Sequence, residues 1–132
     1  MQILQPPGWP RPRGYANGIA AEGRLVFVAG QIGWDETGSI VSDDLVDQLR
    51  QTLENTLAVL REAGAGPEHV VRMTWYVTDK RDYLGRAGDL GAVYRALMGR
   101  HYPAMAVIEV KALLEDRAKL EIETTAVVPS LI

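Results

Sequence analysis

Several segments of this chain have the hydrophobic pattern of β-strands, either continuous or alternating with a period of two. Residues 24–30 and 70–77 are apolar with little alternation, as in strands buried on both faces. Residues 104–110 are similarly apolar, whereas residues 119–127 alternate strictly. A weaker strand is expected at 15–20. The pattern therefore predicts a protein with a substantial sheet.

Two further segments have the periodicity of helices. In residues 43–63, leucine and threonine recur at spacings of three and four, after the capping candidates Ser42 and Asp43. A second helix is expected over residues 83–97, but the glycines of segment 85–91 weaken it, because each costs about 0.5–1 kcal/mol relative to alanine inside a helix. These glycines imply close packing, a kink or an irregular start.

The order of these elements predicts one α+β domain over residues 1–132, with a mixed sheet of about six strands and two helices on one face. Residues 1–14 carry four prolines, which favour an extended arm without secondary structure. The second face of the sheet then lacks a cover, although its strands carry apolar side chains toward both sides. We expect a homo-oligomer, with a small-molecule site where subunits meet.

Composition excludes several classes of protein. The 132 residues include no cysteine, so disulfides and thiolate chemistry are excluded. The formal charge of -3 lacks the excess of positive charge that neutralises phosphates, so nucleic acid is not an expected partner. No apolar run is long enough to span a bilayer and no leader pattern is evident, so we expect a cytoplasmic protein without membrane contact.

The sequence gives little support to serine, metal or nucleotide chemistry. None of Ser39, Ser42 and Ser130 lies in a G-x-S-x-G motif. His69 and His101 lack the spacing of a metal site and fit surface or interface positions better. No glycine-rich phosphate loop is present. We therefore predict no metal and no cofactor.

Carboxylates on the last two strands are the stronger candidates for chemistry. Glu121 and Glu123 point to the strand face opposite Leu120 and Ile122, and Glu109 lies among apolar neighbours. A carboxylate at a partly dry interface can hold and polarise a water, as a hydrolytic general base does. Alternating glutamates also occur on exposed edges or as intersubunit ion-pair partners. The pattern alone leaves both interpretations open.

Motifs from residue 15 to residue 128 together resemble the RidA/YjgF family of reactive intermediate deaminases. These motifs are RGYANGIA, LVFVAGQIGWDETG, the helix QxxQTLENxLxVLxxAG, the strand VVRMTWYVTD, HYPAM and KLEIETTAV. The resemblance implies a chorismate-mutase-like α+β fold, assembled as a homotrimer with clefts between subunits. It also implies hydrolysis of an enamine or imine, such as 2-aminoacrylate, to a ketone and ammonia.

Some pocket positions match the family and others depart from it. Tyr15 matches the tyrosine that lines the cleft, and Glu121 matches the glutamate thought to orient the attacking water. The serine of deaminating members is Ala29 here, the arginine that clamps the substrate carboxylate is Met105, and the pocket asparagine falls near Gly91. The resemblance implies Tyr15 and Glu121 as catalytic residues and the other positions as substrate contacts.

Further substrate contacts are expected near these positions. Gly30 and Gln31 belong to the same AGQ segment as Ala29, and Trp34 follows it closely. Methionine offers only soft apolar contact where arginine would grip a carboxylate in a bidentate way. We therefore expect a larger or less acidic substrate, held by Met105 and by Trp34 or Trp75. The candidates for a replacement clamp are Arg72, Arg95 and Arg100.

Two functions follow from these observations. The first is a trimeric imine or enamine hydrolase in which Glu121 activates water and Tyr15 orients the substrate. The second is a trimer that binds a small metabolite without turnover, which the loss of the serine and the arginine favours. An endoribonuclease activity, described for some relatives, has little physical support in an acidic chain without a basic stripe.

Overall fold

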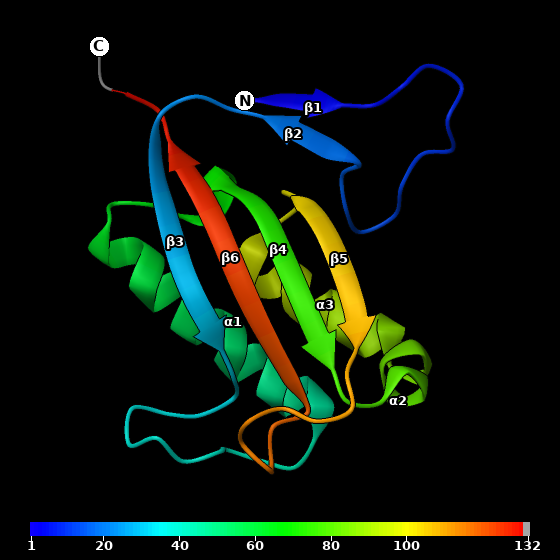
Figure 1. Ribbon diagram of the computed structural model, residues 1–132, viewed down its shortest axis with the longest axis vertical. Coiled ribbons are helices and arrows are strands. Elements are labelled where there is room, and N and C mark those ends of the chain that lie inside the picture. The colour runs from blue at the N-terminus through cyan, green and yellow to red at the C-terminus, as the bar shows by residue number, and fades with distance from the viewer. Residues whose placement is uncertain (131–132) are drawn as a thin grey trace.

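A computed structural model describes residues 1–130 and contains a four-stranded mixed sheet in the order β3-β6-β4-β5. Its strands are β3 (Arg24–Gln31), β4 (Val70–Val77), β5 (Ala104–Glu109) and β6 (Leu120–Val128). Strand β6 runs antiparallel to β3 and β4, and β4 runs parallel to β5 (Figure 1). The predicted mixed sheet is confirmed, but it has four strands rather than about six, because two further strands pair in a separate sheet.

All helices lie on one side of this sheet, behind it in Figure 1. They are α1 (Leu45–Glu62), α2 (Lys80–Gly85) and α3 (Ala87–Met98), with a short 3₁₀ turn at Pro67–His69. The prediction of helices on one face is confirmed, but the second predicted helix is divided at Arg86, where its glycines allow a kink. No helix in the described part of the chain is long and apolar enough to cross a membrane.

The N-terminal segment differs from the prediction. Strands β1 (Gln2–Leu4) and β2 (Gly18–Ala20) pair with each other in a separate antiparallel sheet, above the main sheet in Figure 1. The prediction that residues 1–14 lack secondary structure is therefore wrong for β1, which precedes the first proline and keeps its backbone donors. The expected strand at 15–20 also does not join the main sheet.

The core lies between the sheet and α1. Leu49, Leu53 and Leu60 of α1 are completely buried and belong to one cluster with Met73 of β4 and Ile122 of β6. Their three- and four-residue spacing places the leucines on one helical face. The alternation predicted for the last strand is also confirmed, because every second residue from 120 to 126 is buried.

Gln48 is a buried polar residue that fixes the start of β6. Its side-chain amide donates to the carbonyl oxygens of Ser42 and Arg117, at 2.8 Å and 3.0 Å, and its side-chain oxygen accepts from the backbone N–H of Lys119 at 2.8 Å. The buried amide is thereby satisfied. Because Lys119 immediately precedes β6, Gln48 also helps to place Glu121.

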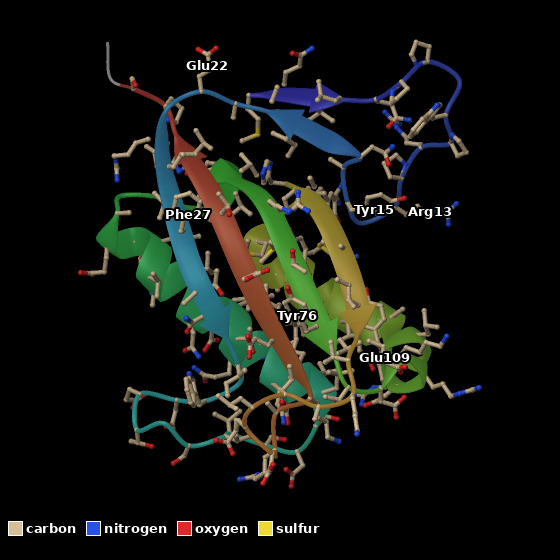
Figure 2. All side chains as sticks on the ribbon, viewed as in Figure 1. Arg13, Tyr15, Glu22, Phe27, Tyr76 and Glu109 are labelled. Carbon is tan, nitrogen blue, oxygen red and sulfur yellow. The ribbon has the colours of Figure 1, made fainter. Side chains whose placement is uncertain are left out.

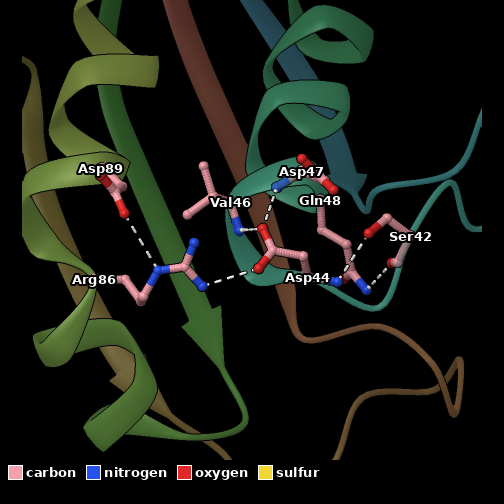
Figure 3. Close-up of polar contacts among 7 residues, drawn as sticks. All are labelled: Ser42, Asp44, Val46, Asp47, Gln48, Arg86 and Asp89. Carbon is pink, nitrogen blue, oxygen red and sulfur yellow. Dashed lines mark hydrogen bonds and ion pairs between the residues drawn. The ribbon is translucent and has the colours of Figure 1, made fainter.

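The N-terminal cap of α1 connects this helix to the α2–α3 junction. Asp44 is the cap, whereas Ser42 and Asp43 were the predicted candidates. The Asp44 carboxylate accepts from two N–H groups in the first turn and pairs with Arg86 at 2.9 Å (Figure 3). The hydrogen bond from Arg86, followed by those from the backbone, holds the pKa of Asp44 below its usual range. This pair ties α3 to the core helix.

The second face of the sheet is open in a single chain. Leu25 and Phe27 of β3 are 59% and 73% exposed, so the prediction that this strand is buried on both faces is wrong within one chain. Figure 2 shows Phe27 and Tyr76 on the face turned toward the viewer, opposite the helices. The face combines apolar residues on β3 with a polar group on β4.

Candidate functional site

A cavity of about 560 Å³ lies beside the edge strand β5. Its walls come from β4, β5, the helices α2 and α3, and the segment that precedes β2. Its lining is mainly aromatic and apolar, and includes Tyr15, Trp75, Tyr83, Tyr94, Tyr102 and Met105. Such a lining favours an organic ligand with a flat or apolar part.

Backbone contacts place Tyr15 at this cavity. The N–H of Ala16 donates to the carbonyl of Pro103 at 2.9 Å, and Ala16 forms a parallel bridge with Ala104, the first residue of β5. The proline-rich segment is thereby held against the edge of the main sheet. Figure 2 shows Tyr15 and Arg13 in this segment.

One face of the helix α3 forms another wall of the cavity. Ala87, Leu90, Gly91, Tyr94 and Arg95 all line the cavity, at intervals of three and four residues. This periodicity is the one that predicted the helix from the sequence.

The aromatic side chains of the wall contact one another. The ring of Tyr94 stacks on Tyr102 with centroids 5.6 Å apart, and Trp75 lies 6.2 Å from Tyr94 and 6.4 Å from Tyr83. The Tyr94 hydroxyl donates to the carbonyl of His101 at 3.0 Å. Burial raises the pKa of Tyr83 and of Tyr94, so both phenols are neutral near pH 7 and can only donate or accept hydrogen bonds.

Glu121 lies outside this cavity, on the open face of the sheet. A β-bulge in β3 between Val28 and Gln31 brings the backbone of Gly30 against the Glu121 carboxylate, and a Cβ atom on Gly30 would overlap its Oε2. Within residues 1–130, Glu121 accepts no hydrogen bond, whereas Glu123 accepts one from the Tyr76 hydroxyl at 2.8 Å. That bond is the main reason why the pKa of Tyr76 is raised.

Strand pairing shows that the cavity and Glu121 belong to opposite faces of the sheet. Tyr76 is directly opposite Glu121 on β6, and the neighbouring pair is Trp75 with Ile122. Successive residues of a strand point to opposite faces, so Trp75 and Glu121 face opposite sides. One ligand cannot contact both in a single chain.

The predicted site residues divide into three groups. Tyr15, Gly91 and Met105 line the cavity. Gly30 lies at the Glu121 carboxylate, in a bulge that begins next to Ala29. The structure brings Gln31 and Trp34 to neither place.

Gln31 and Trp34 have other contacts. The side-chain amide of Gln31 donates to the carbonyl of Ala29 at 3.2 Å. Trp34 is 38% exposed in the loop after β3 and forms an isolated antiparallel β-bridge with Ile40. Its carbonyl oxygen accepts a hydrogen bond from the side-chain amide of Asn55 at 2.8 Å. Trp75, the other tryptophan considered for the substrate, is the one that lines the cavity.

Only one of the three arginines considered as a replacement clamp lies at the cavity. Of Arg72, Arg95 and Arg100, only Arg95 lines the cavity, and Arg72 lines a small hollow on the open face. Arg13, which the sequence analysis missed, also lines the cavity. The only available signal was its position two residues before Tyr15.

Three residues considered for chemistry have structural partners. Glu109 accepts from the backbone N–H of Lys80 at 2.7 Å, at the start of α2. His69 accepts from the backbone of Gly66 at 3.0 Å, and Nε2 of His101 lies 2.6 Å from the carbonyl of Val70. In the described residues, no cluster of three or more histidine and acidic side chains could hold a metal ion.

Comparison with known proteins identifies the family. The family model described as "Endoribonuclease L-PSP" matches residues 10–128. The 2-iminobutanoate/2-iminopropanoate deaminase of Salmonella typhimurium is 34% identical over 116 residues, 86% of each chain. The chain belongs to the RidA/YjgF family. A Rid family protein of unknown function from Yersinia pestis has a TM-score of 0.82 and 32% identity, with 96% of this chain and 98% of that chain covered.

Another solved relative carries a ligand. It is Escherichia coli TdcF with bound serine, with a TM-score of 0.70, 31% identity, and 97% of this chain and 99% of that chain covered. The RidA/YjgF fold predicted from the motifs is therefore confirmed. Within this family, the chain has Met105 and Gly91 in its cavity, where the resemblance implied arginine and asparagine.

Proposed function

We propose that this RidA/YjgF protein hydrolyses the C=N bond of an imine, including an imine formed by tautomerisation of an enamine, in clefts between the subunits of a homotrimer. Water adds to the imine carbon, the carbinolamine collapses, and the products are one ketone and one ammonia. The substrate is one other than 2-aminoacrylate. The deaminase name of the Salmonella relative supports the class of reaction.

One observation carries this proposal: the cavity and Glu121 lie on opposite faces of the same sheet. Each chain thus has two incomplete halves of a site. One half is the cavity with Tyr15 and Met105, and the other is Glu121 with Gly30. In the proposed trimer, the cavity of one subunit meets the Glu121 carboxylate of the next.

The open sheet face supports this assembly. Leu25 and Phe27 expose apolar surface beside the bulge that holds Gly30 against Glu121. An exposed apolar patch next to a polar group is typical of an interface with a second chain. Covering the patch with another copy would also remove water from Glu121, except for the molecule that reacts.

Glu121 acts as the general base in this proposal. Because no group in residues 1–130 donates to it, its carboxylate is free to accept a proton from the attacking water. The carboxyl group returns this proton to the imine nitrogen, which gives the neutral carbinolamine. The carboxylate then transfers the hydroxyl proton to the nitrogen as the C–N bond breaks, so the ketone and ammonia leave and the carboxylate is regenerated. Tyr15 orients the substrate nitrogen from the cavity half of the site.

The experiment measures ammonia release from imines that an amino acid oxidase generates in situ. Glu121→Gln keeps the shape of the side chain and removes the base, so turnover should fall about a hundredfold while the melting temperature stays nearly unchanged. Glu123→Gln is the matched control, since it lies two residues along the same strand face and its amide oxygen can still accept from Tyr76. It should retain nearly full activity.

Two results would contradict the proposal. Equal activity in wild type and Glu121→Gln would remove Glu121 from the reaction. Absence of turnover on every imine, with ligands still stabilising the wild-type protein, would favour a trimer that binds a metabolite without converting it.

A further inference from the structure

Two cations line the aromatic cavity, although Met105 stands where the family resemblance placed an arginine. These are Arg13, in the segment before β2, and Arg95, on α3. Neither forms a salt bridge with any residue from 1 to 130. The cavity therefore has positive charge that the folded chain does not neutralise.

The guanidinium of Arg95 occupies space left by the missing side chain of Gly91. The two residues are one turn apart on α3, and Nη1 of Arg95 lies 3.2 Å from the position that a Cβ atom on Gly91 would occupy. The guanidinium thus folds back over the helix at the cavity wall. A larger residue at 91 would compete for this space.

Much of the remaining lining of the cavity is aromatic. Trp75 is 3% exposed, and its indole Nε1–H has no hydrogen-bond partner in the described residues. This nitrogen is itself buried, so Trp75 contributes ring surface and no free donor to the cavity. The half-buried rings of Tyr83 and Tyr102 offer surface for contact with a flat ligand.

The electrostatics of the wall also suit an anion. Burial raises the pKa of Tyr83 and Tyr94, so neither phenol carries a negative charge that would repel it. No acidic side chain lines the cavity among residues 1–130. An anionic group near Arg95 would meet no like charge there.

We propose that this cavity binds a 2-imino acid with an aromatic side chain, whose carboxylate is held by Arg95 and whose ring lies against Tyr83 and Tyr102. The assignment rests on the proposed deaminase function and adds the class of substrate. Arg95 is the main clamp rather than Arg13, because it projects from a helix and is positioned by its own turn. A guanidinium binds a carboxylate in a bidentate way that Met105 cannot.

Binding is tested with stable keto acids, which have the carboxylate and side chain of the imine but require no turnover. Calorimetry on wild type compares phenylpyruvate, pyruvate and the neutral phenylacetone. Phenylpyruvate should bind about tenfold or more tightly than pyruvate, because only its ring reaches the aromatic wall. Arg95→Gln should weaken phenylpyruvate binding about tenfold to thirtyfold and leave phenylacetone binding unchanged.

Arg100→Gln is the matched control, because Arg100 follows α3 closely and does not line the cavity. It should change phenylpyruvate affinity less than twofold. An effect of Arg95→Gln below twofold, or equal affinity for pyruvate and phenylpyruvate, would overturn the assignment.

The result is separable from the deaminase proposal. Arginine-dependent binding of phenylpyruvate without ammonia release from the aromatic imine would refute the deaminase function and leave the ligand class intact. Ammonia release that is independent of Arg95 and of the aromatic ring would refute the ligand class alone.

Discussion

The backbone of Gly30 lies directly against the carboxylate of Glu121, across the β-bulge that β3 makes opposite β6. The close approach is possible because glycine has no Cβ atom at this point. The carboxylate lies on the open face of the sheet and accepts no hydrogen bond within residues 1–130, whereas Glu123 accepts one from the Tyr76 hydroxyl. The geometry of the proposed base thus depends on a residue of the neighbouring strand.

Gly30→Ala should therefore disturb Glu121 without removing it. The new methyl group would overlap Oε2 and displace the carboxylate, so ammonia release should fall about tenfold to a hundredfold. Steady-state kinetics on the aromatic imine measure this, with circular dichroism to verify the fold. Full activity in Gly30→Ala would mean that the position of Glu121 is unimportant.

A charge on the open face of the sheet should separate the subunits of the proposed trimer. Phe27→Asp places a charge on a side chain that is 73% exposed in one chain, so folding should survive while the trimer dissociates toward the 14.5 kDa chain. Light scattering measures the mass, and ammonia release should be lost with the trimer. Val59→Asp is the control, because Val59 is a 40% exposed residue of α1, on the covered side of the sheet. An unchanged mass for Phe27→Asp would place the interface elsewhere.

Gly91→Ala should stabilise the protein and weaken ligand binding together. Alanine favours a helix over glycine by about 0.5–1 kcal/mol, but its methyl group would press on the Arg95 guanidinium. Gly88→Ala, in the same helix with open space around its Cβ position, should give a similar stabilisation with no loss of phenylpyruvate affinity. Urea titration and calorimetry provide the two readouts. Equal affinities in the two variants would contradict the role of Gly91.

Asp44 makes the stability depend on pH. Its pKa is lower in the folded chain than in the unfolded chain, so its contribution is present above about pH 4 and is lost as the pH falls through the lowered value. Asp44→Ala should cost about 1 kcal/mol at pH 7, through loss of the helix cap. The difference from wild type in urea titrations should shrink near pH 3. A difference that is independent of pH would show that the charge of Asp44 contributes nothing.

The sequence predicted the elements with strong local periodicity. The leucine pattern of α1, the strands β4 and β6, and the side of the sheet that Glu121 occupies all follow from residue spacing. The glycines of segment 85–91 left close packing, a kink or an irregular start open, and the structure has a break at Arg86. These features depend on neighbouring residues and are therefore visible in the chain itself.

Features made by distant contacts were not predictable in this way. Strands β1 and β2 pair across the proline-rich segment, and the backbone N–H of Ala16 donates to the distant carbonyl of Pro103. Arg13 reaches the cavity only through that contact. Likewise, choosing Arg95 among the arginine candidates required the cavity, which only Arg95 of the three lines.

The central claim is that one site needs the cavity of one subunit and Glu121 of another, and mixed trimers test it most directly. Tyr15→Ala removes a cavity residue, Glu121→Gln removes the base, and each variant alone should be nearly inactive. Trimers formed at random from equal amounts of both contain intact sites wherever an unmodified cavity meets an unmodified Glu121. The mixture should regain about a quarter of wild-type ammonia release. Activity no greater than the average of the two separate variants would contradict a shared site.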